Sequence, residues 1–327
     1  MRSILQQMET HMELSLNPVI PFEPVSTETI PEGKQWIAQI KWDGVRMLTY
    51  DDGHNVRLVN RRLNDRTLQY PEIASTRSYC KASSVILDGE LIALKDGRPS
   101  FHEIMRRDGV RNAKNLPLAI KSVSVVYMIY DILFLNGKWL VDEELQERQR
   151  ILSEVIHTNE TIQLVPNYPD ADALFAVMKQ HDMEGVVIKD LQSKYLIGGK
   201  DKRWMKKKIV HDLIAVVGGV TKRGQLVNAL MLGLYDASGQ LWYIGHAGTG
   251  KLTQQDWRSL TDVVNGMTIG SKPFVNVPER SKDAIWIEPR ITVKINYMEW
   301  TRDRNLRQPS IQAIVTASPE ECGFNQL

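Results

Sequence analysis

Short runs in which hydrophobic and polar residues alternate predict β-strands through the first two thirds of the chain. These runs begin at Trp36 and recur to about Val210, and alternation with a period of two gives a strand one buried face. Two stretches instead repeat their hydrophobic residues every three to four positions, which is the spacing of an amphipathic helix. They are 143–157 and the segment that follows Asp170. The pattern predicts one mixed domain of the α+β class.

The texture of the sequence changes after Lys208. Short β-rich runs separated by glycines follow, namely LIAVVGG, ALMLGLYD, LWYIGHAGTG and AIWIEPRITVKINYMEW, with one predicted helix near 253–264. Short strands at regular spacing are typical of a small barrel, so we predict a domain boundary near 208–211. The full expected division is an N-terminal arm or short helix at 1–17, a first domain at 18–209, an all-β domain at 210–318 and a tail at 319–327.

Composition adds that this is an ordinary folded chain with a sizeable core, since 43% of its 327 residues are hydrophobic and 24% are charged. Cys80 and Cys322 are the only cysteines, which excludes a disulfide framework and a cysteine-based zinc cluster. The sequence has no run of about 18 apolar residues and no signal-peptide pattern, so we expect a soluble cytoplasmic protein without a membrane segment. The net charge of +2 is too small to identify a nucleic-acid partner.

The segment WIAQIKWDGVR at 36–46 carries the first candidate chemistry. A period of two places Gln39 and Lys41 on one face of the predicted strand, just before the turn signal Asp43-Gly44. A lysine at the rim of a cleft is a candidate nucleophile. Its amine attacks only when neutral, so its pKa must be lowered by nearby cations or by desolvation. Taken alone, the string is more typical of a solvated lysine in a hairpin.

Two further strand-like strings contain groups suited to binding a nucleotide. In VILDGEL, alternation sends Asp88 and Glu90 to one face, and a carboxylate pair beside a glycine suggests a ribose or metal contact. A half-exposed strand explains this string equally well. In YMIYDILFLNG, at 127–137, aromatic rings on a buried strand are able to stack on a purine. By itself this second string is more typical of plain core.

Two later strings contain groups suited to binding a metal or a phosphate. EGVVIK, at 184–189, has a carboxylate at its start that suits a metal and an amine at its end that suits a phosphate. The stretch 189–208 contains eight basic residues and two aspartates. If the end of this stretch is a strand, Lys206 and Lys208 lie on the same face, where both ammonium groups are placed to bind one phosphate. Each string alone is generic, and a solvated basic loop explains the charge run.

In this order and spacing the strings resemble the motifs of the covalent nucleotidyltransferase superfamily, which comprises DNA ligases, RNA ligases and mRNA capping enzymes. K-x-D-G-x-R, D-G-E, Y-D-I-L-x-L-N-G, E-G-V-V-I-K and W-x-K-x-K together span about residues 36–208. YIGHAGTG at 243–250, Glu299-Trp-Thr301 and Leu306-Arg-Gln-Pro309 are similar to ATP-dependent DNA ligases, especially the bacterial ligases of Ku-dependent end joining. The resemblance implies an adenylation domain with antiparallel sheets and flanking helices, followed by an OB-fold barrel.

The resemblance implies a mechanism of three steps. Lys41 attacks the α-phosphate of ATP, releases pyrophosphate and keeps AMP as a phosphoramide. The AMP then moves to a DNA 5′-phosphate, and a neighbouring 3′-hydroxyl attacks that activated phosphate to seal the nick. One difficult condensation is thereby divided into easier displacements, in which positioning and charge neutralisation dominate.

The same resemblance gives roles to residues around the base and the sugar. Gln39 would contact adenine, and Tyr130 would stack on it. The ribose and the nick phosphate would be surrounded by Arg46, Arg61 and Glu90.

Other motif residues would act on the phosphates and the metal. Glu184 would bind Mg²⁺ directly or through water, with Glu90 as a second carboxylate, and Mn²⁺ suits the same ligands. Lys189, Lys206 and Lys208 would stabilise charge that develops on the α-phosphate. The same cations would lower the pKa of the nucleophilic lysine.

One expected motif is missing near the C-terminus. Ligases of this type usually have an R-x-D-K string shortly after the L-R-x-P segment, and its basic side chains orient pyrophosphate. The corresponding positions in this chain are Val315, Ala317 and Ser318. The loss of two cations predicts a slow first step. Partial rescue is expected from Arg302, Arg304 or Arg307.

Nicked duplex DNA is the expected partner of a monomeric protein. The mixed-charge stretch 280–307 and the basic stretch 189–208 predict a clamp that neutralises phosphates without reading sequence. A Ku-type end-binding partner follows from family analogy alone. Two alternatives stay open: an RNA ligase or capping-type enzyme would share the chemistry of Lys41, and a catalytically weak DNA-end-binding protein would explain the missing motif.

Overall fold

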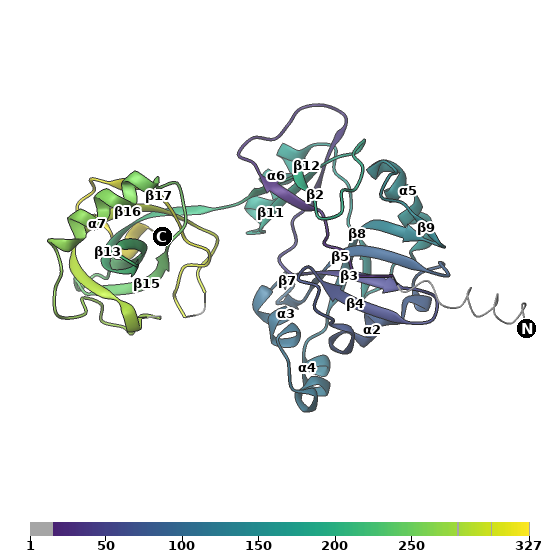
Figure 1. The fold of residues 1–327 in the computed structure, drawn as a ribbon, viewed down its shortest axis with the longest axis horizontal. Coiled ribbons are helices and arrows are strands. Elements are labelled where there is room, and N and C mark those ends of the chain that lie inside the picture. The colour runs from purple at the N-terminus through teal and green to yellow at the C-terminus, as the bar shows by residue number, and fades with distance from the viewer. Residues whose placement is uncertain (1–15, 280, 302, 327) are drawn as a thin grey trace, which may run out of the picture. The chain divides into compact units, whose positions relative to one another are not determined.

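The chain divides into two compact units, Met1–Lys208 and Ile209–Leu327. The computed structural model describes residues 16–279, 281–301 and 303–326. The expected N-terminal arm at 1–17 therefore falls almost entirely outside the described residues. Figure 1 shows both units with their elements labelled.

A four-stranded sheet forms one layer of the first unit. Its order is β1 (Glu23–Ser26), β12 (Lys200–Lys208), β11 (Gly185–Asp190) and β2 (Trp36–Ile40). β11 runs antiparallel to both β2 and β12, whereas β1 pairs with β12 in parallel. Helix α6 (Ala171–Gln180) packs on β2 and β11. The side chain of its N-cap residue, Asp170, accepts a hydrogen bond from the Ala173 backbone N–H and fixes where the helix begins.

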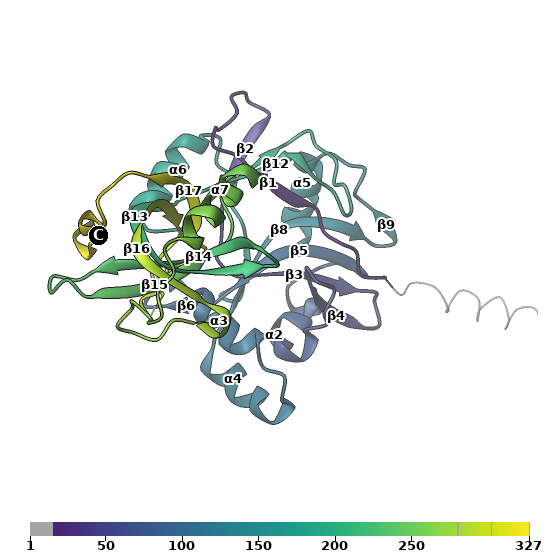
Figure 2. The ribbon, with the colours of Figure 1, turned by 60° about the vertical axis from the view of Figure 1, so that its left-hand side comes forward.

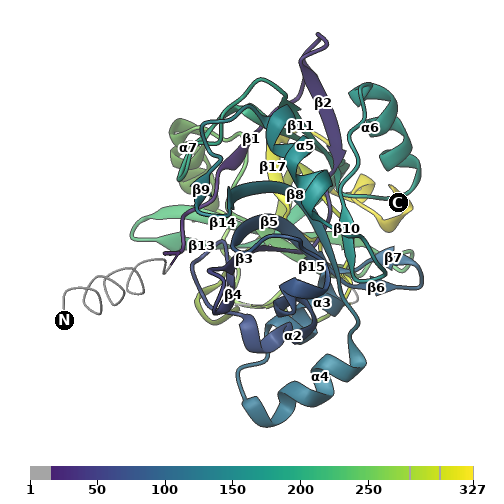
Figure 3. The same cartoon turned by 90° about the vertical axis from the view of Figure 1, so that its right-hand side faces the viewer.

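A larger sheet forms the second layer. Its order is β10 (Ile162–Leu164), β8 (Val126–Leu135), β5 (Val85–Ile92), β3 (Val45–Asp51) and β4 (Val56–Asn60), and β9 (Lys138–Trp139) pairs with β8. A short hairpin, β6 (Leu94–Lys95) with β7 (Arg98–Pro99), follows β5. β10 joins β8 in parallel, and the pairings among the other strands of this sheet are antiparallel. Figure 3 shows the succession of β8, β5, β3 and β4.

Alternation along these central strands builds two separate apolar layers. On β3, Met47 belongs to a cluster that includes Ile73, Ile104 and Leu152 from three helices. Its neighbour Leu48 belongs to a second cluster, which the N-terminal segment and β12 complete. Successive side chains of a strand point to opposite faces, so each face of the sheet is covered by a different part of the chain.

Five α-helices lie within the described residues of the first unit, where the hydrophobic pattern predicted two. The predicted pair is confirmed as α5 (Leu145–Val155) and α6. The others are α2 (Pro71–Ala74), α3 (Phe101–Asp108) and α4 (Leu116–Ser122). α3 was missed because it buries charge: Arg107 is fully buried and donates hydrogen bonds to the carbonyls of Gln69 and Val123.

The described part of the second unit contains a five-stranded antiparallel sheet and one α-helix. The order is β15 (Leu241–Ala247), β14 (Leu226–Tyr235), β13 (His211–Arg223), β16 (Ile285–Tyr297) and β17 (Ser310–Val315). Helix α7 (Gln254–Asn265) packs on β14 (Figure 2). It begins with a capping box between Thr253 and Asp256. The C-terminal segment packs here too, because Cys322 is fully buried and its carbonyl accepts from Tyr235 N–H.

The expected fold class is confirmed, with two differences in strand pairing. Each main sheet of the first unit is mixed, since it contains one parallel pair. The described strands of the second unit do not form a closed barrel, although a single parallel bridge from Gly250 to Ile311 joins the segment after β15 to β17. None of the described helices is long and apolar enough to span a membrane.

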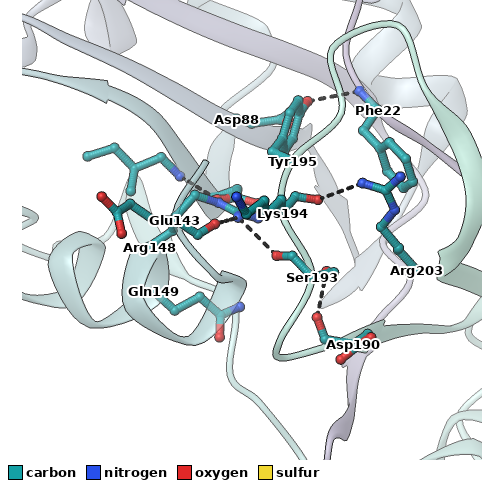
Figure 4. A network of polar contacts seen from close by, with 12 residues as sticks. Phe22, Asp88, Glu143, Arg148, Gln149, Asp190, Ser193, Lys194, Tyr195 and Arg203 are labelled. Carbon is teal, nitrogen blue, oxygen red and sulfur yellow. Dashed lines mark hydrogen bonds and ion pairs between the residues drawn. The ribbon is translucent and has the colours of Figure 1, made fainter. Parts of the chain in front are cut away.

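The buried ion pair between Arg148 and Asp131 anchors α5 to β8. Both side chains are fully buried, and the guanidinium donates to both carboxylate oxygens at 2.7 and 2.8 Å. Figure 4 shows that Arg148 also reaches Ser193, whose carbonyl it contacts at 3.2 Å. A bidentate pair with its remaining donors satisfied tolerates burial, whereas a single buried charge does not.

We therefore expect Asp131→Ala to lower the free energy of unfolding by about 3–5 kcal/mol, because it leaves Arg148 buried without its counter-charge. Glu154→Ala on the same helix removes one carboxylate from an exposed pair with Arg150 and should cost less than about 1 kcal/mol. Urea unfolding of both variants, with Asp131→Asn as an isosteric check, measures the difference. Equal losses for Asp131→Ala and Glu154→Ala would contradict this account.

Candidate functional site

Strand register brings Lys41, Glu184 and Lys208 to one edge of the four-stranded sheet. β11 starts at Gly185, directly after Glu184, and both of its antiparallel neighbours end there. Gly185 pairs with Lys208 on one side, and its carbonyl accepts from the Lys41 backbone N–H at 3.0 Å on the other. Three residues that are distant in sequence therefore meet because of strand pairing alone.

The carboxylate of Glu184 bridges the two lysines. Its Oε2 lies 2.6 Å from Lys41 Nζ and its Oε1 lies 3.2 Å from Lys208 Nζ. The side chain of Glu184 is 7% exposed and that of Lys41 is 19% exposed, so the pair lies at a rim that a ligand can reach. Gly185 has φ +136°, and a Cβ there would lie 2.2 Å from the Lys207 carbonyl oxygen, so only glycine permits this close strand approach.

Lys206 lies with this lysine group, as its position two residues before Lys208 predicts. Burial lowers the pKa of half-buried Lys206, and Lys41, Lys208 and Lys200 lower it further. Glu23 opposes the shift. A surface with several ammonium groups and few counter-charges suits a ligand that carries several negative charges.

Arg61 is placed differently from the other predicted residues. It lies in the turn after β4, its side chain is 57% exposed, and it pairs with Glu23 at 3.5 Å. Glu23 also approaches Lys200 at 3.9 Å. Glu23 thus links Arg61 to Lys200, and the guanidinium of Arg61 is directed to Glu23 and not to Lys41.

The two carboxylates of the D-G-E string have different surroundings. Glu90 is half-buried, and burial raises its pKa to about 8, with Glu184 and Asp88 adding to the rise and Lys41 and Arg46 opposing it. Asp88 is fully buried and accepts two hydrogen bonds from the Arg46 guanidinium. The expectation that both contact ribose or a metal therefore suits Glu90 and does not suit Asp88.

Asp88 is the central acceptor of a buried hydrogen-bond network. Its oxygens also accept hydrogen bonds from the hydroxyls of Tyr130 at 3.0 Å and Tyr195 at 2.9 Å. Tyr195 in turn accepts from the Phe22 backbone N–H at 3.0 Å, and Arg46 donates to the Phe22 carbonyl at 2.6 Å. Figure 4 shows Tyr195 between Phe22 and Asp88. Sequence reasoning missed Tyr195, because it lies in a loop with no hydrophobic pattern to place it beside Asp88.

Lys189 is buried where the resemblance implied a phosphate contact. It is 2% exposed, and its Nζ lies 4.2 Å from the centre of the Tyr130 ring and 3.8 Å from that of Trp204. The amine is buried without a hydrogen-bond partner. Burial lowers the pKa of Lys189 to about 7, although Asp131 and Asp88 oppose the shift. The faces of the two aromatic rings also favour the charged amine.

Gln39 is buried beside the lysine group and shares the sheet face of Lys41. Its Nε2 donates to Asn167 Oδ1 at 2.8 Å. Asn167 is an exposed residue in the segment between β10 and α6, where the hydrophobic pattern gave no reason to select it.

Comparison with known families identifies two matching domains. Residues 20–208 match the ATP dependent DNA ligase domain, and residues 223–315 match the ATP dependent DNA ligase C terminal region. The chain belongs to the family of ATP-dependent DNA ligases.

Several relatives are similar over most of this chain. The multifunctional non-homologous end joining DNA repair protein LigD of Mycobacterium tuberculosis is 29% identical over 289 residues, which cover 85% of this chain and 36% of LigD. A DNA ligase of Thermococcus fumicolans is 30% identical over 276 residues, covering 80% of this chain and 47% of that ligase. This chain therefore spans less than half the length of these two relatives.

A solved structure of mycobacterial DNA ligase D complexed with ATP and MES is 27% identical to this chain. It superposes with a TM-score of 0.51 and covers 93% of this chain and 97% of the solved chain. The likeness therefore extends over both units.

Lys189 should reduce stability at neutral pH. Its folded pKa of about 7 lies below the unfolded value of about 10.4, so the unfolded chain gains a proton first as the pH falls. The penalty grows between about pH 10 and pH 7 and is constant below that range. We expect Lys189→Met to raise the free energy of unfolding at about pH 6 by roughly 1–4 kcal/mol, and the gain should shrink as the pH approaches about 10.

Lys207→Met is the matched control, because half-buried Lys207 also lies over an aromatic ring, that of Phe175, at 4.7 Å. Urea unfolding at several pH values should give no pH-dependent gain for this control. If Lys189→Met were less stable than the wild type at about pH 6, the contact with the two rings would outweigh the desolvation of the amine.

Proposed function

We propose that this chain seals nicks with 5′-phosphate and 3′-hydroxyl ends in duplex DNA through a covalent lysyl-AMP on Lys41. In the first step a bond forms between Lys41 Nζ and the α-phosphorus of ATP, and the bond to the bridging oxygen breaks, releasing pyrophosphate. In the second step the DNA 5′-phosphate displaces Lys41 from AMP. In the third step the 3′-hydroxyl displaces AMP and forms the phosphodiester.

The ion pair between Lys41 and Glu184 is the observation that carries this proposal. The amine of Lys41 must lose a proton before it attacks, and Glu184 Oε2 is already its hydrogen-bond partner at 2.6 Å. Glu184 is therefore placed to receive that proton. The backbone of Lys41 is held next to Glu184, because its N–H donates to the Gly185 carbonyl at 3.0 Å.

Phosphate binding falls to the lysines of β12. Lys206 and Lys208 are on one face of the strand, close to Lys41, whereas Lys207 points to the other face and lies over Phe175 of α6. Cations fixed around the α-phosphate stabilise the additional charge of the transition state. Arg46 donates its hydrogen bonds to Asp88 and to the Phe22 carbonyl, so its role is to hold these segments together more than to bind phosphate.

Glu90 and Glu184 fit a Mg²⁺ ion that arrives with the nucleotide. Within the described residues no group of three or more His, Cys, Asp or Glu side chains forms a metal cage. The two carboxylates do interact, since Glu184 raises the pKa of Glu90. Mg²⁺ typically takes one or two carboxylates together with substrate phosphates, and Mn²⁺ accepts the same ligands. Bound there, the ion would neutralise charge on the leaving pyrophosphate.

Nicked duplex DNA is the proposed substrate, and DNA repair is the proposed setting. Support comes from the likeness to LigD, whose name includes non-homologous end joining and DNA repair. Exposed Arg61 and half-buried Lys206 supply cations for phosphates of the duplex. A Ku-type end-binding partner extends the same analogy.

Lys41→Arg should abolish formation of the covalent AMP adduct. Arginine keeps the charge opposite Glu184, but its guanidinium stays protonated and is not a nucleophile. The measurement is incubation with α-labelled ATP and Mg²⁺, followed by a chase with nicked duplex DNA. Wild-type protein should take the label and pass it to the DNA.

Lys207→Ala is the control for this experiment, because it removes a lysine on the opposite face of β12 and should leave labelling near the wild-type level. Label that persists in Lys41→Arg would refute Lys41 as the nucleophile. A chase onto nicked RNA in place of nicked DNA would favour an RNA ligase.

The segment expected to carry the missing basic motif lies at the end of the sheet in the second unit. Thr292 Oγ1 donates to the carbonyls of Val315 at 2.9 Å and Ala317 at 3.0 Å, so the backbone there is held in place. Ser318 is exposed. Of the proposed substitutes, Arg307 pairs with Glu299 at 2.7 Å, and Arg302 lies outside the described residues.

Restoring the motif should accelerate the first step. We expect the triple variant Val315→Arg, Ala317→Asp and Ser318→Lys to raise the rate of lysine adenylylation at low ATP by about tenfold, the effect of one charge-assisted hydrogen bond. Sealing of a nick that already carries 5′-adenylate should not change. Single-turnover kinetics measure both steps, and Thr316→Lys controls for added charge. Equal first-step rates in wild type and triple variant would reject a slow first step.

A further inference from the structure

Three side-chain amides form a chain that ends beside Lys41. Gln39 on β2 donates through Nε2 to Asn167 Oδ1 at 2.8 Å. Asn167 donates through Nδ2 to Gln149 Oε1 at 2.5 Å. In return, Gln149 Nε2 donates to Asn167 Oδ1 at 3.4 Å. Gln149 belongs to α5 and follows the buried Arg148 (Figure 4). The three residues come from three separate elements.

Backbone pairing fixes the middle of this chain against β2. Ala38 N–H donates to the Tyr168 carbonyl at 2.8 Å, and Tyr168 N–H donates to the Ala38 carbonyl at 2.9 Å. These two bonds join the residues directly next to Gln39 and Asn167. Because the backbone on both sides is held, the Asn167 amide has a defined position opposite the Gln39 amide.

The orientation of the Gln39 amide decides what it offers to a purine. A primary amide has one acceptor end and one donor end of nearly equal size, so a half-turn exchanges them. With Nε2 bound to Asn167, the other end of the Gln39 amide is the acceptor Oε1. Adenine carries a 6-amino donor, whereas guanine carries an O6 acceptor at the same place. An acceptor facing that edge favours adenine and repels guanine.

We propose that Asn167, supported by Gln149, is a positioning residue that fixes the Gln39 amide and thereby sets the preference for ATP over GTP. This rests on the proposed function, in which a purine nucleotide lies beside Gln39 and Lys41. Asn167 acts through Gln39 and touches no nucleotide. Loss of Asn167 frees the Gln39 amide to turn and present Nε2 to guanine.

The test compares kcat/KM for adenylylation and guanylylation of Lys41 with labelled ATP and GTP. Asn167→Ala should reduce the ATP-to-GTP ratio by at least about tenfold, because one discriminating hydrogen bond is no longer oriented. Most of the change should appear in KM for GTP. Asn167→Asp offers only acceptors, so Gln39 must still donate to it, and the ratio should stay at the wild-type value.

Gln149→Ala should lower the ratio less than Asn167→Ala. Gln146→Ala on the same helix is the control, since the Gln146 side chain donates its hydrogen bond to Glu144 and not to Asn167. Asn167 is exposed, so its substitutions are not expected to unfold the protein. An unchanged ratio in Asn167→Ala, or a fall in Asn167→Asp as large as in Asn167→Ala, would overturn the positioning role. A wild-type chain that takes label from neither nucleotide would instead overturn the proposed function.

Discussion

The antiparallel pairing of β11 with β2 and β12 is the constraint on which the rest of the site depends. Its register ends both neighbours at the point where β11 begins, so strand pairing brings Lys41, Glu184 and Lys208 together. A shift of one residue in either pairing would turn a lysine to the opposite face. Gly185 protects that register, because its backbone conformation and close approach to Lys207 exclude a side chain.

A second group of residues in the first unit carries buried charges. Asp88 and Arg46 form a bidentate pair, and the hydroxyls of Tyr130 and Tyr195 satisfy the remaining acceptor capacity of Asp88. Paired charges with complete hydrogen bonding are tolerated in a core, and they fix geometry more strictly than apolar contacts do. The amine of Lys189 lacks a hydrogen-bond partner and lies over aromatic rings. Its burial therefore lowers the stability of the fold, in contrast to the paired charges.

The strands β5, β8 and β11 could be predicted because most of their residues are buried, so each is a short hydrophobic run in the sequence. The helices α5 and α6 could be predicted because each buries one face, so their hydrophobic residues recur every three to four positions. Helix α3 was missed because it buries Arg107, so its interior face is not wholly apolar in sequence. Helices α2 and α4 have only four and seven residues, too few to show a helical repeat. A charged residue on a helix reads as solvent-facing unless its partner is known, and that partner comes from elsewhere in the chain.

The sequence by itself determined the strands, the main helices and the family, because local alternation and ordered motif strings are properties of neighbouring residues. It also singled out Lys41 and Glu184 as a nucleophile and a carboxylate of one motif set. Only the tertiary structure decided which groups meet. It joined Asn167 to Gln39, committed Asp88 to Arg46, and buried Lys189 between two rings. Such contacts join residues of separate strands and loops, and their formation depends on register and burial, to which no local pattern is sensitive.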